Sequence, residues 1–214
     1  MPPDDGADSP SQTVVLATAN SHKLREIAEM LRDAPFRLIG LDSFPQVILP
    51  PETEDTFEGN AAVKAAAAAR QTGMIAIGDD SGLEVEALDG RPGILSARFA
   101  GAGATDEANL NLLLQLMAGV PDGDRGARFV CALAIAAPDG KLSVSRGVCE
   151  GRITSSPRGA NGFGYDPIFL IVDDGRTLAQ FSAAEKNAIS HRYHAVRTAL
   201  PRILNALAGI EFQE

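Results

Sequence analysis

The chain has 214 residues, of which 45% are hydrophobic, and its formal net charge is -9 at pH 7. This composition predicts a folded chain with an ample core, organised as one α/β domain or as two modest lobes. It argues against a membrane partner, because no apolar run is long enough to cross a bilayer, and against a nucleic-acid partner, because the chain is acidic. The two cysteines, Cys131 and Cys149, lack metal-ligand spacing, so we expect free thiols and a cytoplasmic protein.

The N-terminal part predicts a tail followed by a strand, a helix and a second strand. Residues 1–12 are rich in proline, aspartate and serine and contain no apolar signal region, so we expect a flexible tail rather than a targeting peptide. The β-branched and apolar residues 13–17 predict a strand. A polar loop over 18–21 leads to an expected helix over 23–31 with apolar residues at helical spacing, and a short strand is expected over 36–40.

An alanine-rich helix and a buried strand are expected next. The helix is predicted to begin near Asp55, with Glu58 three residues later completing a capping box, and to end at Gly73. The apolar run 74–77 predicts a buried strand that ends in a tight turn at Asp79-Asp80-Ser81-Gly82.

The remaining part alternates between hairpins and helices. In chain order we expect a hairpin turn at 89–90, a helix over 105–119, paired strands over 128–137 and 142–148, a glycine-rich loop over 159–164, a strand over 168–172 and a helix from Ser182 that Pro201 bends or divides. This mixture of hairpins and helices favours an α/β fold with a mixed sheet.

The pair Asp79-Asp80 is the first candidate for chemistry. Ligands of open α/β sheets lie at the carboxyl ends of strands, where this pair is expected. Adjacent carboxylates repel each other, and a cation offsets that repulsion. We interpret the pair as the site of a divalent metal with a hydrolytic or phosphoryl-transfer task. The alternative interpretation is that both residues only cap a turn.

The loop between the first strand and its helix is the second candidate. Thr18, Asn20, Ser21 and Lys23 provide hydroxyls, an amide and a cation beside free backbone N–H groups at a helix start, which suits a phosphate chain. The loop lacks the glycines of a Walker loop. A plain helix cap with a solvated lysine is the alternative.

Two later segments are candidates for holding a flat base. Phe163 and Tyr165 can stack on a ring, or they can simply fill the edge of a core. Lys186, His191 and Arg192 concentrate donors in a short helical segment, or they form a solvated helix face. An arginine donates to an oxo group but accepts nothing from an amine, so Arg192 can separate a 6-oxopurine from adenine.

Together these motifs resemble the inosine triphosphate pyrophosphatase family, the Ham1-like non-canonical purine nucleoside triphosphatases. The matching segments follow the family order from about residue 13 to 208: 18–23, 56–58 with Asn60 and Lys64, 79–82, 92–93, 96–98, 162–167, 185–187 and 190–192. Two departures are the extra acidic tail and Gly59, which replaces an acid often present beside Glu58.

The resemblance implies an elongated α/β fold with a two-lobed mixed sheet, flanking helices and a central nucleotide cleft. It implies one domain over 13–210, usually assembled as a homodimer. The implied activity is hydrolysis of ITP, dITP and XTP to the monophosphate and pyrophosphate with Mg²⁺, which cleanses the nucleotide pool. Two alternatives stay open: a pyrophosphatase for modified pyrimidine nucleotides, and a nucleotide-binding regulator without catalysis.

The resemblance also implies roles for individual residues. Asp80 is the expected catalytic residue, which holds Mg²⁺ and activates the attacking water. Asp79 and Glu52 are the further acidic residues expected at the metal. The implied substrate contacts are Thr18, Asn20, Ser21, Lys23 and Ser81 for the triphosphate and Phe163, Gly164, Tyr165, Asp166, Lys186, His191 and Arg192 for the base. Whether Lys186 contacts the base or a phosphate is left open.

Overall fold

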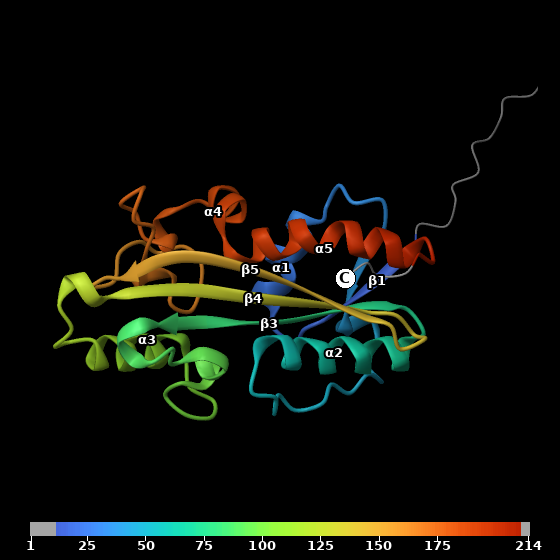
Figure 1. Cartoon of the computed structure of the whole chain (residues 1–214), viewed down its shortest axis with the longest axis horizontal. Coiled ribbons are helices and arrows are strands. Elements are labelled where there is room, and N and C mark those ends of the chain that lie inside the picture. Colours follow the sequence, from blue (N-terminus) through green and yellow to red (C-terminus); the bar gives the residue numbers. More distant parts are fainter. Residues whose placement is uncertain (1–11, 211–214) are drawn as a thin grey trace, which may run out of the picture.

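The computed structural model describes residues 12–210, which form a six-stranded mixed sheet with helices on both faces (Figure 1). The strands are β1 (Thr13–Ala17), β2 (Arg37–Gly40), β3 (Ile75–Val85), β4 (Gly126–Ala136), β5 (Leu142–Ile153) and β6 (Phe169–Leu170). Their order is β2-β1-β3-β4-β5-β6, with β1 parallel to β2 and β3 and every later pair antiparallel. The expected mixed α/β fold is confirmed.

The helices cover the two faces of this sheet. They are α1 (Ser21–Met30), α2 (Phe57–Thr72), α3 (Asp106–Leu116), α4 (Ala183–Ile189) and α5 (His191–Leu207). Figure 1 shows α5 and α2 on opposite sides of the long strands. Side chains alternate along each strand, so Ile77 packs with α1 and α5 whereas Ala76 packs with α2. Within residues 12–210, no helix is long and apolar enough to cross a bilayer.

The sheet has two lobes because its strands differ in length. The pairing of β1 with β3 ends at Ala17 opposite Gly78, whereas β3 continues to Val85 alongside β4. Beyond β1, a second core forms around Leu83, Leu113 and Phe169. The expected elongated, two-lobed arrangement is therefore present (Figure 1).

The expected tight turn at Asp79-Asp80 is wrong. Strand β3 runs through both residues because β4 pairs with it without interruption, from Ala76 opposite Ala136 to Val85 opposite Ala127. The hairpin expected at Asp89-Gly90 is also incomplete. The turn is present, with both residues at positive φ, but the chain returns only as a single bridge between Glu84 and Pro92.

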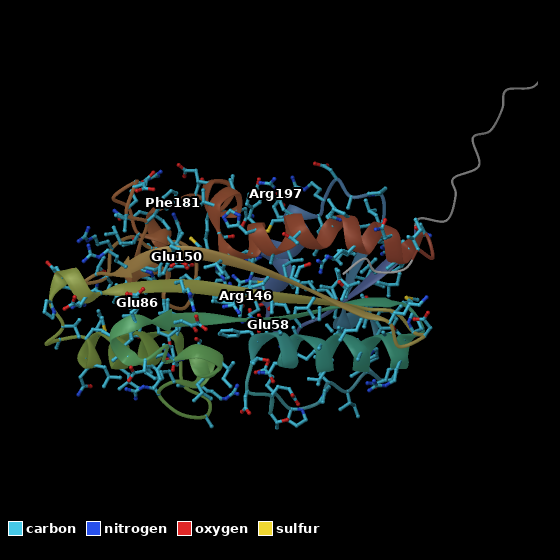
Figure 2. All side chains as sticks on the ribbon, in the orientation of Figure 1. Glu58, Glu86, Arg146, Glu150, Phe181 and Arg197 are labelled. Atoms are coloured by element: carbon cyan, nitrogen blue, oxygen red, sulfur yellow. The ribbon has the colours of Figure 1, made fainter. Side chains whose placement is uncertain are left out.

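Helix α2 begins as expected but with a different cap. The side chain of Thr56, not Asp55, accepts from the backbone N–H of Gly59. Glu58 does not complete a capping box, because the residue three positions after Thr56 is Gly59; Oε1 of Glu58 instead lies 2.8 Å from Nη1 of Arg146 on β5 (Figure 2). This ion pair ties the first turn of α2 to the far strand.

The C-terminal helix is divided at Ser190 and not at Pro201, so of the two expected effects of Pro201, to bend or to divide the helix, the division is wrong. Ser190 is extended, with φ −74° and ψ 161°, and its side chain caps α5 by accepting from the N–H of Tyr193. Pro201 lies inside α5. The expected flexible tail lies outside the described residues except for Gln12, whose carbonyl accepts from the N–H of Arg37 and whose side chain donates to Leu207.

Helix α5 lies directly on the backbone of β5 at Gly147. A Cβ atom there would be 2.2 Å from the carbonyl oxygen of His191 and 2.3 Å from the nitrogen of Ala195. Gly147→Ala should therefore lower the free energy of unfolding by about 2 kcal/mol or more, because backbone atoms must move to relieve the clash. Urea denaturation followed by circular dichroism measures this.

The control is Gly119→Ala, because nothing lies within 4 Å of the added atom at that position. Equal stability of the two variants would contradict the close packing of α5 on β5.

Candidate active site

A pocket of about 630 Å³ lies beside the part of β3 that extends beyond β1. Asp80, Ser81 and Gly82 of β3 line it, together with Thr18 and Ala19, which follow directly after β1. This volume is in the range of small-molecule sites. The pocket therefore occupies the place where β1 stops and the two lobes meet.

The pocket gathers most of the predicted site residues. It is lined by Thr18, Asn20, Lys23, Glu52, Asp80, Ser81, Phe163, Gly164, Tyr165, Asp166, His191 and Arg192. Ser21, Asp79 and Lys186 do not line it directly. Lining residues that were not predicted as site residues include Lys64, Ser96, Arg98, Asp106 and Asn109.

The start of α1 forms one end of the pocket. The side chain of Asn20 caps the helix by accepting from the N–H groups of His22 and Lys23 at 2.9 and 3.2 Å. Thr18 Oγ1 accepts from the N–H of Asn20. The helix-cap interpretation is thus confirmed for Asn20. The capped loop still presents Lys23 and the positive end of the helix dipole to the pocket.

Asp79 lies on the α1 side of β3, paired with a lysine. Its carboxylate is fully buried, with Oδ1 2.6 Å from Nζ of Lys23, and Cys131 donates to Oδ2 at 3.3 Å. Burial raises the pKa of Asp79, but the charges of Lys23 and Arg192 outweigh it, and the pKa lies below its ordinary value. Asp79 therefore fixes the position of Lys23.

Asp80 points to the opposite face of the strand, toward α2. Nζ of Lys64 lies 3.6 Å from its Oδ1 and 2.7 Å from Oε1 of Glu52. Burial raises the pKa of Asp80 more than the lysine charges lower it, so this pKa lies above its ordinary value. Arg98 also binds Glu52, through Nη1 at 3.1 Å from Oε2.

The residues around Asp80 fit a magnesium ion. Oδ2 of Asp80 is buried and accepts no hydrogen bond from the described residues. Within residues 12–210 there is no group of three or more histidine, cysteine or acidic side chains arranged for a metal. Mg²⁺, however, is usually held by one or two carboxylates together with substrate phosphates and water. Asp80 and Glu52 meet that requirement, whereas Asp79 faces away.

At the α1 end of the pocket, two cations share one acid that was not among the predicted site residues. Glu26 of α1 contacts Lys186 at 2.8 Å and Arg192 at 2.7 Å. Arg192 also donates to Ser81 Oγ at 2.9 Å. Glu26 lies three residues after Lys23 on α1, so the two share one helix face, and this spacing could have identified Glu26 as a site residue from the sequence.

Phe163 closes the same end of the pocket. Its ring stacks on His22 with centroids 4.9 Å apart, and Nζ of Lys186 lies 4.8 Å from its centroid. Asp166 accepts from the N–H of Phe163 and binds Lys186 at 2.5 Å. Tyr165 lines the pocket and also packs in the core, and its hydroxyl donates to the carbonyl of Ser96.

Comparisons with known proteins found relatives that match most of the chain. The sequence model of the Ham1 family matches residues 14–202. A protein from Desulforamulus reducens named dITP/XTP pyrophosphatase is 46% identical over 194 residues, covering 91% of this chain and 96% of that protein. One of the same name from Geobacter sulfurreducens is 48% identical, covering 86% and 92%. The structure of a HAM1 protein from Coxiella burnetii superposes with a TM-score of 0.82 at 42% identity, covering 91% and 99%.

His191 makes the stability of the protein depend on pH. Burial and the charges of Arg192 and Lys186 lower its pKa well below the ordinary 6.5. Unfolding restores the ordinary pKa, so the unfolded chain binds more protons below about pH 6.5 and the folded state loses stability there. We expect this residue to lower the free energy of unfolding between pH 7 and pH 5, by at most about 1.4 kcal/mol per pH unit.

Urea denaturation of His191→Gln over this pH range should therefore give a flatter profile than the wild type. The matched control is His194→Gln, an exposed histidine one turn further along α5, which should keep the wild-type slope. Parallel profiles for the wild type and His191→Gln would contradict the assignment of a neutral buried imidazole.

Proposed function

The chain belongs to the Ham1 family, and on this premise we propose that it hydrolyses non-canonical purine nucleoside triphosphates, dITP, ITP and XTP, to the monophosphate and pyrophosphate. The observation that carries the proposal is one pocket that joins three parts. These are the phosphate-type loop at Lys23, the acidic site at Asp80 and the donors at Arg192. The names of the relatives agree with this substrate class.

The phosphate end of the pocket supplies positive charge. Lys23 is held by Asp79 at the start of α1, where free N–H groups and the helix dipole attract anions. Lys64 and Arg98 add two further cations beside the acids. Neutralising the charge on phosphoryl oxygens is the main source of rate in such reactions.

Asp80 is placed to handle the proton of the attacking water. In the proposed step the water oxygen bonds to the α-phosphorus, the bond to the α–β bridging oxygen breaks, and Asp80 Oδ2 takes the proton. Burial raises the pKa of Asp80 above its ordinary value, and a bound cation would counter that shift. Asp80 and Glu52 would hold Mg²⁺, which when bound supplies further charge neutralisation at the phosphates.

The base end of the pocket supplies donors for an oxo group. Nε of Arg192 is buried and has no hydrogen-bond partner among the described residues, while Glu26 and Ser81 hold the two other nitrogens. An oxo oxygen accepts from such a donor, whereas the amino group of adenine faces it with another donor. The neutral ring of His191 adds no charge next to the base.

The same proposal covers assembly and location. We propose one domain over 13–210, a homodimer as the family resemblance implies, and a cytoplasmic location that suits the two free buried thiols.

A nucleotide panel tests the function. Pyrophosphate release from dITP and XTP should exceed release from dATP, dTTP and dUTP, and it should require Mg²⁺. Preferential turnover of the pyrimidine nucleotides would favour a pyrimidine pyrophosphatase, and binding without release would favour a regulator.

Asp80→Asn should lower kcat for dITP by about 10²–10⁴-fold, because the side chain can no longer take a proton. The circular dichroism spectrum should stay that of the wild type. Asp122→Asn, at an exposed aspartate outside the pocket, serves as the control with full activity. Near-normal turnover by Asp80→Asn would remove this residue from catalysis.

A further inference from the structure

Glu52 lies on an irregular strap, defined here as residues 48–54, which forms one wall of the pocket. Leu49, Pro50 and Pro51 of the strap line the pocket beside Glu52. The strap contains no helix or strand, and Ile48 at its start is 78% exposed. Prolines cannot donate backbone hydrogen bonds, so the position of Glu52 must be fixed by contacts from elsewhere.

Two side-chain amides of α2 bind the two ends of the strap. Gln71 accepts from the N–H of Ile48 at 3.0 Å and donates to its carbonyl at 2.9 Å. Asn60 does the same for Glu54, at 3.1 and 3.3 Å. Each amide thus pairs with both backbone groups of one strap residue, as a neighbouring strand would.

The strap has little slack between these two anchors. Asn60 and Gln71 are separated by roughly 17 Å along the axis of α2 at the rise of an α-helix. The six steps from Ile48 to Glu54, in the extended form that prolines favour, span about 19 Å. Both ends are fixed and the chain is nearly taut, so the amides limit where the backbone of Glu52 can lie, and Lys64 and Arg98 then bind its carboxylate.

The position of Glu52 determines which carboxylate the ammonium group of Lys64 pairs with. Nζ of Lys64 is 2.7 Å from Glu52 and 3.6 Å from Asp80, so Glu52 takes the closer contact with the ammonium group and Asp80 the longer one. If Glu52 withdrew, Asp80 would remain as an ion-pair partner of Lys64. The ammonium group would then compete for the carboxylate that the reaction needs.

We propose that Gln71 and Asn60 are positioning residues that act through Glu52. They hold the strap along α2 so that Glu52 engages Lys64 and leaves Oδ2 of Asp80 free. This inference rests on the proposed function, which gives Asp80 and Glu52 their roles.

The first test is Gln71→Ala, compared with Gln115→Ala as the matched control. Gln115 is an exposed glutamine near the end of α3 and does not line the pocket. We expect Gln71→Ala to raise the Mg²⁺ concentration needed for half-maximal rate by about threefold to tenfold, the range for lost hydrogen bonds, with little change in KM for XTP. Gln71→Glu should raise this Mg²⁺ concentration by a similar factor, because a carboxylate cannot donate to the carbonyl of Ile48.

A double-mutant cycle separates positioning from a general loss of structure. In a Glu52→Gln background, Gln71→Ala should have no further effect on the Mg²⁺ dependence, because the residue through which it acts is already altered. An equal effect in both backgrounds would overturn the proposal.

Amide hydrogen exchange gives a readout that does not depend on activity. Without metal or nucleotide, exchange at Ile48 and Glu54 should be faster in Gln71→Ala than in the wild type, and unchanged in Gln115→Ala. If the wild type is active but Gln71→Ala matches it in both exchange and Mg²⁺ dependence, the inference fails. If the wild type releases no pyrophosphate, the proposed function fails, and exchange still tests the anchors.

Asn60→Asp tests the second anchor. Asn60 is fully buried, so truncation to alanine can prevent folding, whereas aspartate keeps the shape and the acceptor for the N–H of Glu54. Faster exchange confined to the strap supports the proposal, and wild-type exchange in a folded Asn60→Asp overturns it.

Discussion

The site depends on two adjacent carboxylates that are neutralised from opposite faces of one strand. Because side chains alternate along β3, Asp79 meets Lys23 of α1 whereas Asp80 meets Lys64 of α2. An unpaired buried charge costs several kcal/mol, so each helix must place its lysine accurately. On the α2 side, Gly78 permits this approach, because a Cβ there would lie 2.1 Å from the carbonyl oxygen of Ala61. The close packing of α2 on β3 and the pairing of Lys64 with Asp80 therefore depend on each other.

Unequal strand lengths turn this pair of charges into a pocket. Where β1 stops at Ala17, β3 continues with one side turned toward the cavity rather than toward a strand. The 3₁₀ segment Gly93–Arg98 covers β3 again further on, with Ser96 accepting from the N–H of Leu83. The part of β3 that lies between the end of β1 and this 3₁₀ segment is where a ligand can reach the two acids.

The sequence predicted what depends on local pattern and missed what depends on distant partners. The helix after Thr105 and the strands on either side of Asp139-Gly140 were predicted correctly, since caps, spacing and turn residues are local. The turn at Asp79-Asp80 was wrong because the β4 segment that keeps the chain extended lies some fifty residues later. The anchors at Asn60 and Gln71 were missed because they bind backbone groups, which leave no trace in residue identity.

The break at Ser190 sets the angular phase between two cations. In one continuous helix, Lys186 and Arg192 would be six residues and therefore about 120° apart around the axis, on different faces of the helix. The extended residue between α4 and α5 resets that rotation, and both side chains converge on Glu26. An insertion or deletion at this joint would rotate α5 relative to α4, so that Lys186 and Arg192 would no longer meet at a common acid.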